Sequence, residues 1–401
     1  MTTMTNLTTA VTGGVDTHGQ IHHAAVLDHV GRELGDREFP TTPSGYRALL
    51  SWLRGHGQLE RVGVEGTGTY GAALSRHLRA AGVEVVEVDR PDRKARRAQG
   101  KSDPLDAYSA ARATLAGRAS GAPKARDGRV EAIRALRVAR SSAVKARSQT
   151  TNQFKALLVT APAELREQLR GLTTTALIAT CARLRPTGDV ASPEHATKTA
   201  LRRLARRHQF LSEEISDADA ELHTLVTAAA PRLIALPGVG TEVAGQLLTT
   251  VGDNPDRLHS EAAFAHLCGV APIPASSGRT RRHRLNRGGD RAANNALYVV
   301  VLGRLRYDQR TRGLCRPAHH RRPVQARDHP LFEALRRPRA LQRPAARQPA
   351  GRSGRRGLTI HRSIERLATP RPSDLTSALP RVRHRKRILS RTLQLPATID
   401  R

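Results

Sequence analysis

Four acidic residues in the first third of the chain have types and spacings suited to holding a metal ion. They are Asp16, Glu65, Asp103 and Asp106. Clustered carboxylates repel one another, and divalent cations relieve that repulsion by binding hard oxygen ligands. Mg²⁺ in particular binds through few carboxylates together with phosphate oxygens of a substrate. Each acid taken singly is explained by solvent exposure, but the joint pattern favours a Mg²⁺ site that acts on phosphate esters.

The elements expected around these acids are strands and one helix start. Asp16 lies in GGVDTHGQIHHAAVLD, whose near-alternating apolar residues predict a strand. Glu65 ends a short apolar run that is closed by Gly66 and Gly68, which places it at the carboxyl end of a strand. A further run, GVEVVEVD, predicts another strand. The acids therefore fall at strand ends, where side chains from different segments can meet.

The last two acids lie where the sequence predicts the start of a helix. In KSDPLDAYSAARATLAG, Ser102 is an N-cap candidate and Pro104 suits the first turn. Asp103 and Asp106 are three residues apart, so they share one face at the positive end of the helix. This part of the chain is expected to be an α/β unit.

The overall charge indicates a polyanionic partner. The 401 residues include 67 Lys and Arg against 35 Asp and Glu, a formal net charge of +32, and the sequence pI is about 11.6. This balance is typical of proteins that contact phosphate backbones. No run of eighteen apolar residues predicts a membrane span, the first ten residues do not resemble a signal peptide, and the three cysteines match no zinc or disulfide spacing. We expect a cytoplasmic, nucleoid-associated protein with no membrane partner.

Two long stretches in the middle of the chain have helical patterns. GRASGAPKARDG forms a Gly, Pro and basic linker, and residues 129–161 then contain neither Pro nor Gly. A second stretch covers residues 198–230. Together they predict an antiparallel helical pair or coiled-coil-like stalk between two end domains. The basic face of the first helix is either solvated or in contact with nucleic acid.

A glycine-rich turn and a serine pair follow the stalk. Gly238 and Gly240 in LPGVG separate two short helical segments, as in a helix-hairpin-helix module that binds DNA or in a plain helical turn. Ser276 and Ser277 precede Gly278 in a polar turn. Serines in such a turn are usually turn formers, but one becomes a nucleophile on a phosphodiester if its proton is accepted and cations stabilise the transition state. The nearby candidates for DNA contact are Arg279, Arg281, Arg282, Arg284 and Arg287.

Five of these motifs, in their order and spacing, resemble the DEDD transposases of the insertion sequence 110 group. They are GVDTHGQIHHAAVLD, VGVEGTGTYG, KSDPLDAYSAAR, LPGVGTEVAGQLL and GVAPIPASSGRTRRHRLNRGGDRAANNAL, and together they cover about residues 12–312. The resemblance implies a ribonuclease H-like domain over residues 12–120, a helical coiled-coil region over 125–228 and a mainly α transposase domain over 230–312.

The resemblance also implies the chemistry. The four acids, Asp16, Glu65, Asp103 and Asp106, would bind Mg²⁺, and a serine before Gly278 would attack DNA and become linked to a 5′ phosphate. That serine matches Ser277, with Ser276 as the alternative. Family members act as oligomers, dimers or tetramers, on element ends and target DNA, and take a structured guide RNA. A metal-dependent nuclease that uses only the acids and a non-catalytic nucleic-acid-binding scaffold are the competing interpretations.

Beyond residue 312 the composition changes. Residues 313–401 contain 22 Lys and Arg against 5 Asp and Glu, a net charge of +17, and ten of the 23 prolines. The segment has no persistent apolar periodicity, which predicts a disordered basic tail. A frameshift is the alternative. Residues 327–341 can be encoded by codons that, when the reading frame is moved one base forward, encode EIIRCLKRYVARELY instead. That peptide is an amphipathic helix, and the same shift turns GLCRP into AYVAR.

We predict a single-base insertion or deletion near codon 312 that replaced a terminal helix. Loss of such a helix exposes apolar surface in the serine-bearing domain and makes this copy less stable or inactive. Sequencing the gene tests the prediction. An uninterrupted family-like reading frame that ends at the present stop would contradict it.

Overall fold

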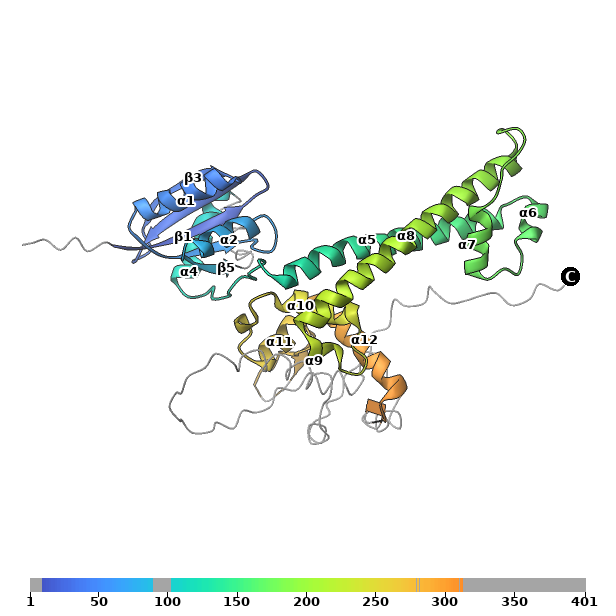
Figure 1. The fold of residues 1–401 in the computed structure, drawn as a ribbon. Coiled ribbons are helices and arrows are strands. Elements are labelled where there is room, and N and C mark those ends of the chain that lie inside the picture. The colour runs from blue at the N-terminus through green and yellow to red at the C-terminus, as the bar shows by residue number, and fades with distance from the viewer. Residues whose placement is uncertain (1–8, 89–101, 279, 281, 310, 313–401) are drawn as a thin grey trace, which may run out of the picture.

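The computed structural model describes residues 9–88, 102–278, 280, 282–309 and 311–312. A five-stranded sheet with three flanking helices is followed by a long pair of helices and by a mainly helical unit (Figure 1). The predicted tail, residues 313–401, lies outside the described residues, so its predicted disorder stays a prediction. In the described part of the chain no helix is long and apolar enough to cross a membrane.

The sheet has the strand order β3-β2-β1-β4-β5. β1 is antiparallel to β2 and parallel to β4, and β4 is parallel to β5. The predicted single strand in GGVDTHGQIHHAAVLD is wrong, since it forms the hairpin of β1 and β2, and β3 was not predicted at all. The strands are β1 (Ala10–Thr17), β2 (Ile21–Asp28), β3 (Glu33–Pro40), β4 (Gln58–Glu65) and β5 (Glu84–Val88).

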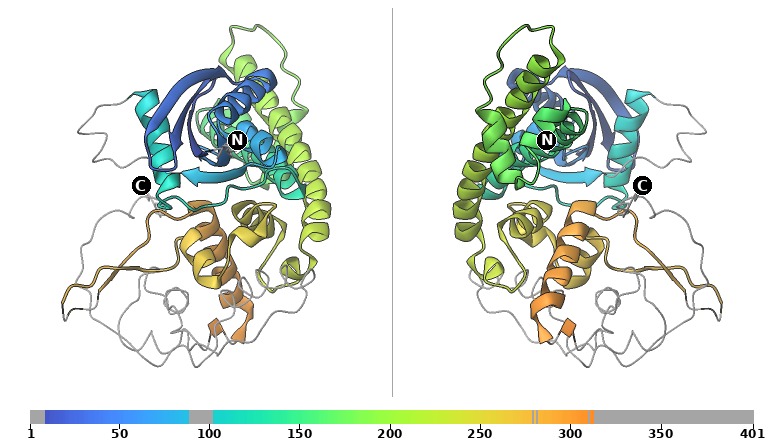
Figure 2. Two further views of the ribbon diagram at one scale, coloured as in Figure 1. Left: turned by 90° about the vertical axis from the view of Figure 1, so that its left-hand side faces the viewer. Right: turned by 90° about the vertical axis from the view of Figure 1, so that its right-hand side faces the viewer.

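The two faces of the sheet are covered by different helices. Val15 and Val64 point into a core shared with α1 (Pro43–Gly55) and α2 (Ala72–Ala80). The opposite face packs against α4 (Asp103–Leu115), which Figure 2 shows on the other side of the sheet from α1 and α2. Alternate residues of β1 therefore face α4, and Asp16 is one of them.

Two glycines let α4 lie directly on the strands. A Cβ atom at Gly14 of β1 would lie 2.8 Å from the Cα atom of Ala111, and one at Gly63 of β4 would lie 2.8 Å from the carbonyl oxygen of Ala110. Both distances are shorter than Cβ atoms show in folded proteins, so any larger residue would push the helix away. Small residues on α4 match the glycines, namely Ala107, Ala110, Ala111 and Thr114.

The predicted antiparallel helical pair is α5 (Arg129–Val159) and α8 (Pro193–Ala229), which lie side by side (Figure 1). Arg140 of α5 forms an ion pair with Asp219 of α8, and Arg137 forms one with Glu242. These arginines are therefore used within the fold rather than on a free basic face. The short helices α6 (Ala163–Gln168) and α7 (Thr174–Ala182), which were not predicted, cover the far end.

The segment predicted as a linker is tied down by hydrogen bonds. Asn254 donates to the carbonyl oxygen of Pro123 (2.9 Å) and accepts from the amide of Ala125 (2.9 Å). Asp253 accepts from the amide of Val130 (2.8 Å) and so caps the first turn of α5. The linker thus joins the sheet unit to the C-terminal unit along a fixed path.

The C-terminal unit is mainly helical, and its core residues, such as Leu247 and Phe264, form one cluster with Ile133 of α5 and Leu222 of α8. Cys181, in the stalk, and Cys268 are buried free thiols, while Cys315 lies outside the described residues. The domain boundaries inferred from the sequence remain predictions. The elements are α9 (Pro231–Ile234), α10 (Thr241–Val251), η1 (Pro255–Arg257), α11 (Glu261–Leu267), β6 (Ile273–Pro274), β7 (His283–Arg284) and α12 (Arg291–Tyr307).

Gly14→Ala should destabilise the sheet unit by about 1–3 kcal/mol, because the added methyl group forces α4 off the strands. Gly55→Ala is the matched control, since a Cβ there meets no atom within 4 Å. Trp52, the only tryptophan, packs on the sheet-unit core, so urea unfolding followed by its fluorescence measures this unit. Equal midpoints for the two variants would contradict the close packing.

Candidate metal centre and serine hairpin

Asp16 and Glu65 lie next to each other at the carboxyl ends of two parallel strands. Val15 of β1 pairs with Val64 of β4, so the residues that follow them stand side by side. Both face α4, like Gly14 and Gly63 two residues earlier. The hydroxyl of Thr17 donates to the carbonyl oxygen of Glu65 (2.8 Å) and ties the two strand ends together. Asp16 is buried and Glu65 is half-buried.

The helix start of α4 brings the other two acids to the same place. Ser102 is the N-cap, as predicted, and Pro104 lies in the first turn, although the serine side chain makes no capping hydrogen bond. Asp103 and Asp106 both lie in that first turn, and Asp106 is buried. The aligned peptide dipoles of α4 favour negative charge here. Because the helix rests on Gly14 and Gly63, its N-terminus lies over the strand ends.

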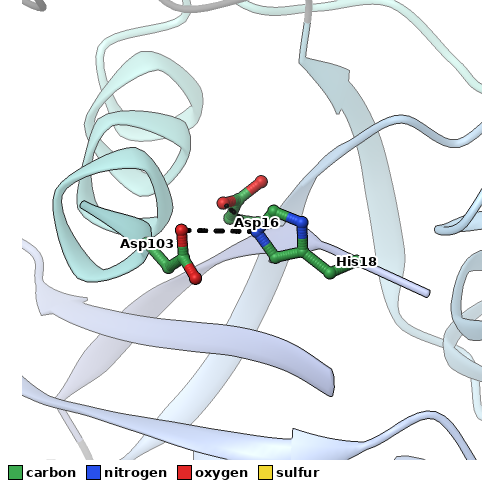
Figure 3. Close-up of side chains that lie close together, drawn as sticks. All are labelled: Asp16, His18 and Asp103. Atoms are coloured by element: carbon green, nitrogen blue, oxygen red, sulfur yellow. Dashed lines mark hydrogen bonds and ion pairs between the residues drawn. The ribbon is translucent and has the colours of Figure 1, made fainter. Parts of the chain in front are cut away.

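His18 joins the acids, although the sequence reasoning missed it. Its Nε2 atom is 3.1 Å from Oδ2 of Asp16 and 3.4 Å from Oδ1 of Asp103 (Figure 3). Ligand atoms of these three residues all lie within 4.8 Å of one another. The available signal was the spacing, since residues two apart on an extended chain share a face. His18 was missed because only acidic residues were considered as candidate ligands.

The electrostatics of the cluster disfavour three negative charges without a cation. Burial raises the pKa of Asp16 above its ordinary value, His18 opposes this, and the charges of Asp106 and Asp103 raise the pKa further. A divalent ion beside Asp16 would remove the repulsion that these neighbours cause. The donor set of carboxylates with one imidazole fits such an ion.

A hydrogen-bonded network supports the sheet beside the cluster. His23 of β2 pairs with Asp16 in the strand register, and its Nε2 atom is 2.7 Å from Oδ2 of Asp36. The hydroxyl of Tyr108, on α4, donates to Oδ1 of the same aspartate (3.3 Å). Burial and the nearby Asp36 raise the pKa of Tyr108 to about 12, so it stays a donor at neutral pH. This network connects α4 to β2 and β3.

The two candidate serines lie on a β-hairpin formed by β6 and β7. Ser276 is held in the hairpin, because its hydroxyl accepts from the amide of Arg282 (3.1 Å). Ser277 pairs with Thr280 through backbone hydrogen bonds at the tip, where Gly278 has φ +53°. Within the described part of the chain the Ser277 hydroxyl is exposed and makes no hydrogen bond.

The predicted DNA-contacting residues have mixed surroundings. Arg282, Arg284 and Arg287 are exposed around the hairpin, while Arg279 and Arg281 lie outside the described residues. Gly238 has φ +82°, and a Cβ there would lie 3.2 Å from the carbonyl oxygen of Val300, so packing on α12 explains this glycine. A Cβ at Gly240 would meet nothing within 4 Å, and the residue is the N-cap of α10.

The structure brings the acids together but leaves the serine hairpin elsewhere. Asp16, Glu65, Asp103 and Asp106 come from β1, β4 and α4, which pack on one another. The β6–β7 hairpin extends from the C-terminal unit instead (Figure 2). One chain therefore presents two separate sets of candidate catalytic groups.

Two family models match the chain. A model of IS110-type DEDD transposases, described as transposase, matches residues 13–161. A model described as transposase IS116/IS110/IS902 family matches residues 230–316. The first match contains all four acids, and the second contains both serines. A search of curated proteins found no match.

Asp16→Asn should stabilise the metal-free protein at neutral pH. The pKa of Asp16 is higher in the fold than the ordinary 3.8, so its ionisation destabilises the fold as pH rises above about that value. The gain should therefore shrink as pH falls and disappear below 3.8, where aspartate is protonated in both the folded and the unfolded state. The gain is measured from the urea unfolding midpoints of wild type and variant at several pH values, with a chelator present to keep the protein metal-free. Asp217→Asn is the control, because Asp217 is exposed on α8. If Asp16→Asn lost stability at neutral pH, the inferred repulsion between Asp16 and its neighbouring carboxylates would be contradicted.

Proposed function

Because this chain belongs to the IS110 group of DEDD transposases, which cut and join DNA, we propose that it does so at insertion-sequence ends by a Mg²⁺-dependent reaction with Ser277 as nucleophile. The observation that carries the proposal is the meeting of Asp16 and Glu65, at two strand ends, with the first turn of α4. Carboxylates at such a junction suit phosphodiester chemistry better than a structural role, since Asp16 is buried among like charges.

In the proposed site Asp16, Glu65, Asp103 and Asp106 hold the metal. Bound Mg²⁺ would supply Lewis acidity at the scissile phosphate and neutralise developing charge on its oxygens. The protein would position this ion through the four carboxylates. The ends of β1 and β4 fix two of them, and the first turn of α4 fixes the other two. The mixed sheet, with β1 antiparallel to β2 and parallel to β4, supports a ribonuclease H-like fold for this unit.

Ser277 is better placed than Ser276 to act as the nucleophile. Its hydroxyl is exposed at a hairpin tip, whereas the hydroxyl of Ser276 already bonds within the hairpin. In the reaction the serine oxygen would lose its proton to a base and bond to phosphorus. The bond from phosphorus to the 3′ oxygen would break, and that oxygen would take up a proton from solvent and leave as a 3′ hydroxyl. The exposed arginines of the hairpin would stabilise the negative charge of the transition state.

The separation of the two sets of groups supports an oligomer as the active form. The acids of one copy would meet the serine of another on the same DNA, in a dimer or tetramer. A nonspecific basic surface reads phosphate rather than sequence, so a structured guide RNA that pairs with element ends and target would supply the sequence choice. A DNA nuclease that uses the acids with water is the second candidate, favoured because the acids converge within one chain.

A covalent adduct distinguishes the two candidates. The full chain and a frame-restored version are incubated with Mg²⁺, the DNA flanking the gene and RNA transcribed from it, and adducts are trapped by denaturation. We expect a protein–DNA adduct in the wild type and in Ser276→Ala, and none in Ser277→Ala or Asp16→Asn, with a loss of at least about 10³-fold. Cleavage that persists in both serine variants but stops in Asp16→Asn would establish the nuclease instead.

A further inference from the structure

His18 offers the acidic cluster a ligand of a different chemical kind. Its Nε2 atom lies 3.1 Å from Asp16 and 3.4 Å from Asp103 (Figure 3). Ligands at right angles around an octahedral ion, each about 2.1 Å from it, lie about 3.0 Å apart. The imidazole nitrogen and the two carboxylates are thus spaced like neighbouring ligands of one ion.

The backbone holds His18 in this place. Its amide donates to the carbonyl oxygen of Ile21 (3.2 Å) and closes the turn between β1 and β2. The hydroxyl of Thr41 donates to the carbonyl oxygen of Gly19 (3.0 Å), which fixes the next residue of the turn. The His18 side chain is 42% exposed, so an ion from solvent can reach it.

These two distances also suit a plain hydrogen bond from an imidazole N–H to the carboxylates. In that case His18 would only offset their charge, and it would not choose between metal ions. A coordinating nitrogen has a different consequence, because carboxylate oxygens suit Mg²⁺ and Mn²⁺ alike, while imidazole suits transition metals.

We propose that His18 is a metal ligand alongside Asp16 and Asp103, and that its nitrogen biases the site towards Mn²⁺ over Mg²⁺. The inference rests on the proposed function, in which the acids hold the metal ion. It makes His18 a residue that determines metal specificity in a site otherwise built from oxygen ligands.

Pulsed electron paramagnetic resonance of Mn²⁺ bound to the full chain tests this directly, because a coordinated imidazole gives a nitrogen coupling. We expect the coupling in the wild type and its loss in His18→Ala and His18→Gln. Mn²⁺ affinity in His18→Ala should fall at least about tenfold, while Mg²⁺ affinity, measured by competition, should fall less than about threefold. His29→Ala is the matched control. His29 is exposed in the turn after β2, at the opposite end of the β1–β2 hairpin from His18.

The outcomes separate this inference from the proposed function. Mn²⁺ binding that needs Asp16 but shows no nitrogen coupling would overturn the role of His18 and leave the acidic site standing. Coupling that persists in His18→Ala would also overturn it, because another histidine would then be the ligand. A wild type that binds neither ion would overturn both the inference and the proposed function.

Discussion

The direct packing of α4 on Gly14 and Gly63 is the contact on which the candidate site depends. Any side chain at either glycine would meet the helix backbone, so the sheet and α4 approach as closely as backbones allow. The consequence appears one turn away, where the first turn of α4 lies over the ends of β1 and β4. Asp103 and Asp106 reach Asp16 because the two glycines let the helix lie this close to the sheet. A fold with larger residues at these two positions would keep the four acids in the sequence and lose the cluster.

The acidic cluster destabilises the metal-free fold at the same place where the candidate metal site lies. Buried Asp16 stands among the charges of Asp103 and Asp106, which raise its pKa, and His18 opposes their effect. Such an arrangement destabilises the metal-free fold, and close packing elsewhere in the sheet unit offsets the cost. The C-terminal unit is joined to this sheet along a fixed path, through Asn254 and Asp253. The hairpin with Ser277 belongs to that unit, and the proposal of a partner copy as the source of the second set of groups starts from this separation.

Local sequence signals predicted the elements that depend on local chemistry. Gly66 after a short apolar run marked the end of β4 at Glu65, and Ser102 with Pro104 marked the start of α4. The helical character of the stalk followed from periodicity in the same way, whereas that of the C-terminal unit came from the family resemblance. The β1–β2 hairpin was predicted as one strand, because the turn between Thr17 and Ile21 is short and its one glycine, Gly19, was not taken as a turn signal.

Features that depend on distant contacts were not predictable from the sequence. The linker looked loose because its composition is rich in Gly and Pro, yet Asn254, 129 residues away from Ala125, ties it down. Arg137 and Arg140 looked like a free basic face, and their partners Glu242 and Asp219 lie far along the chain. Gly238 suggested phosphate contact, whereas a Cβ atom there would meet the Arg304 side chain and the Val300 carbonyl oxygen, both on α12.

The central claim is that segments distant in sequence meet at one metal site, and iron-directed cleavage tests it most directly. Fe²⁺ bound in place of the native ion, with ascorbate and peroxide, cuts the backbone only where it passes close to the ion. The account predicts cuts in the same protein near Asp16, near Glu65 and near Asp103, all abolished in Asp16→Asn. Cuts confined to one of these segments, or unchanged in that variant, would contradict it.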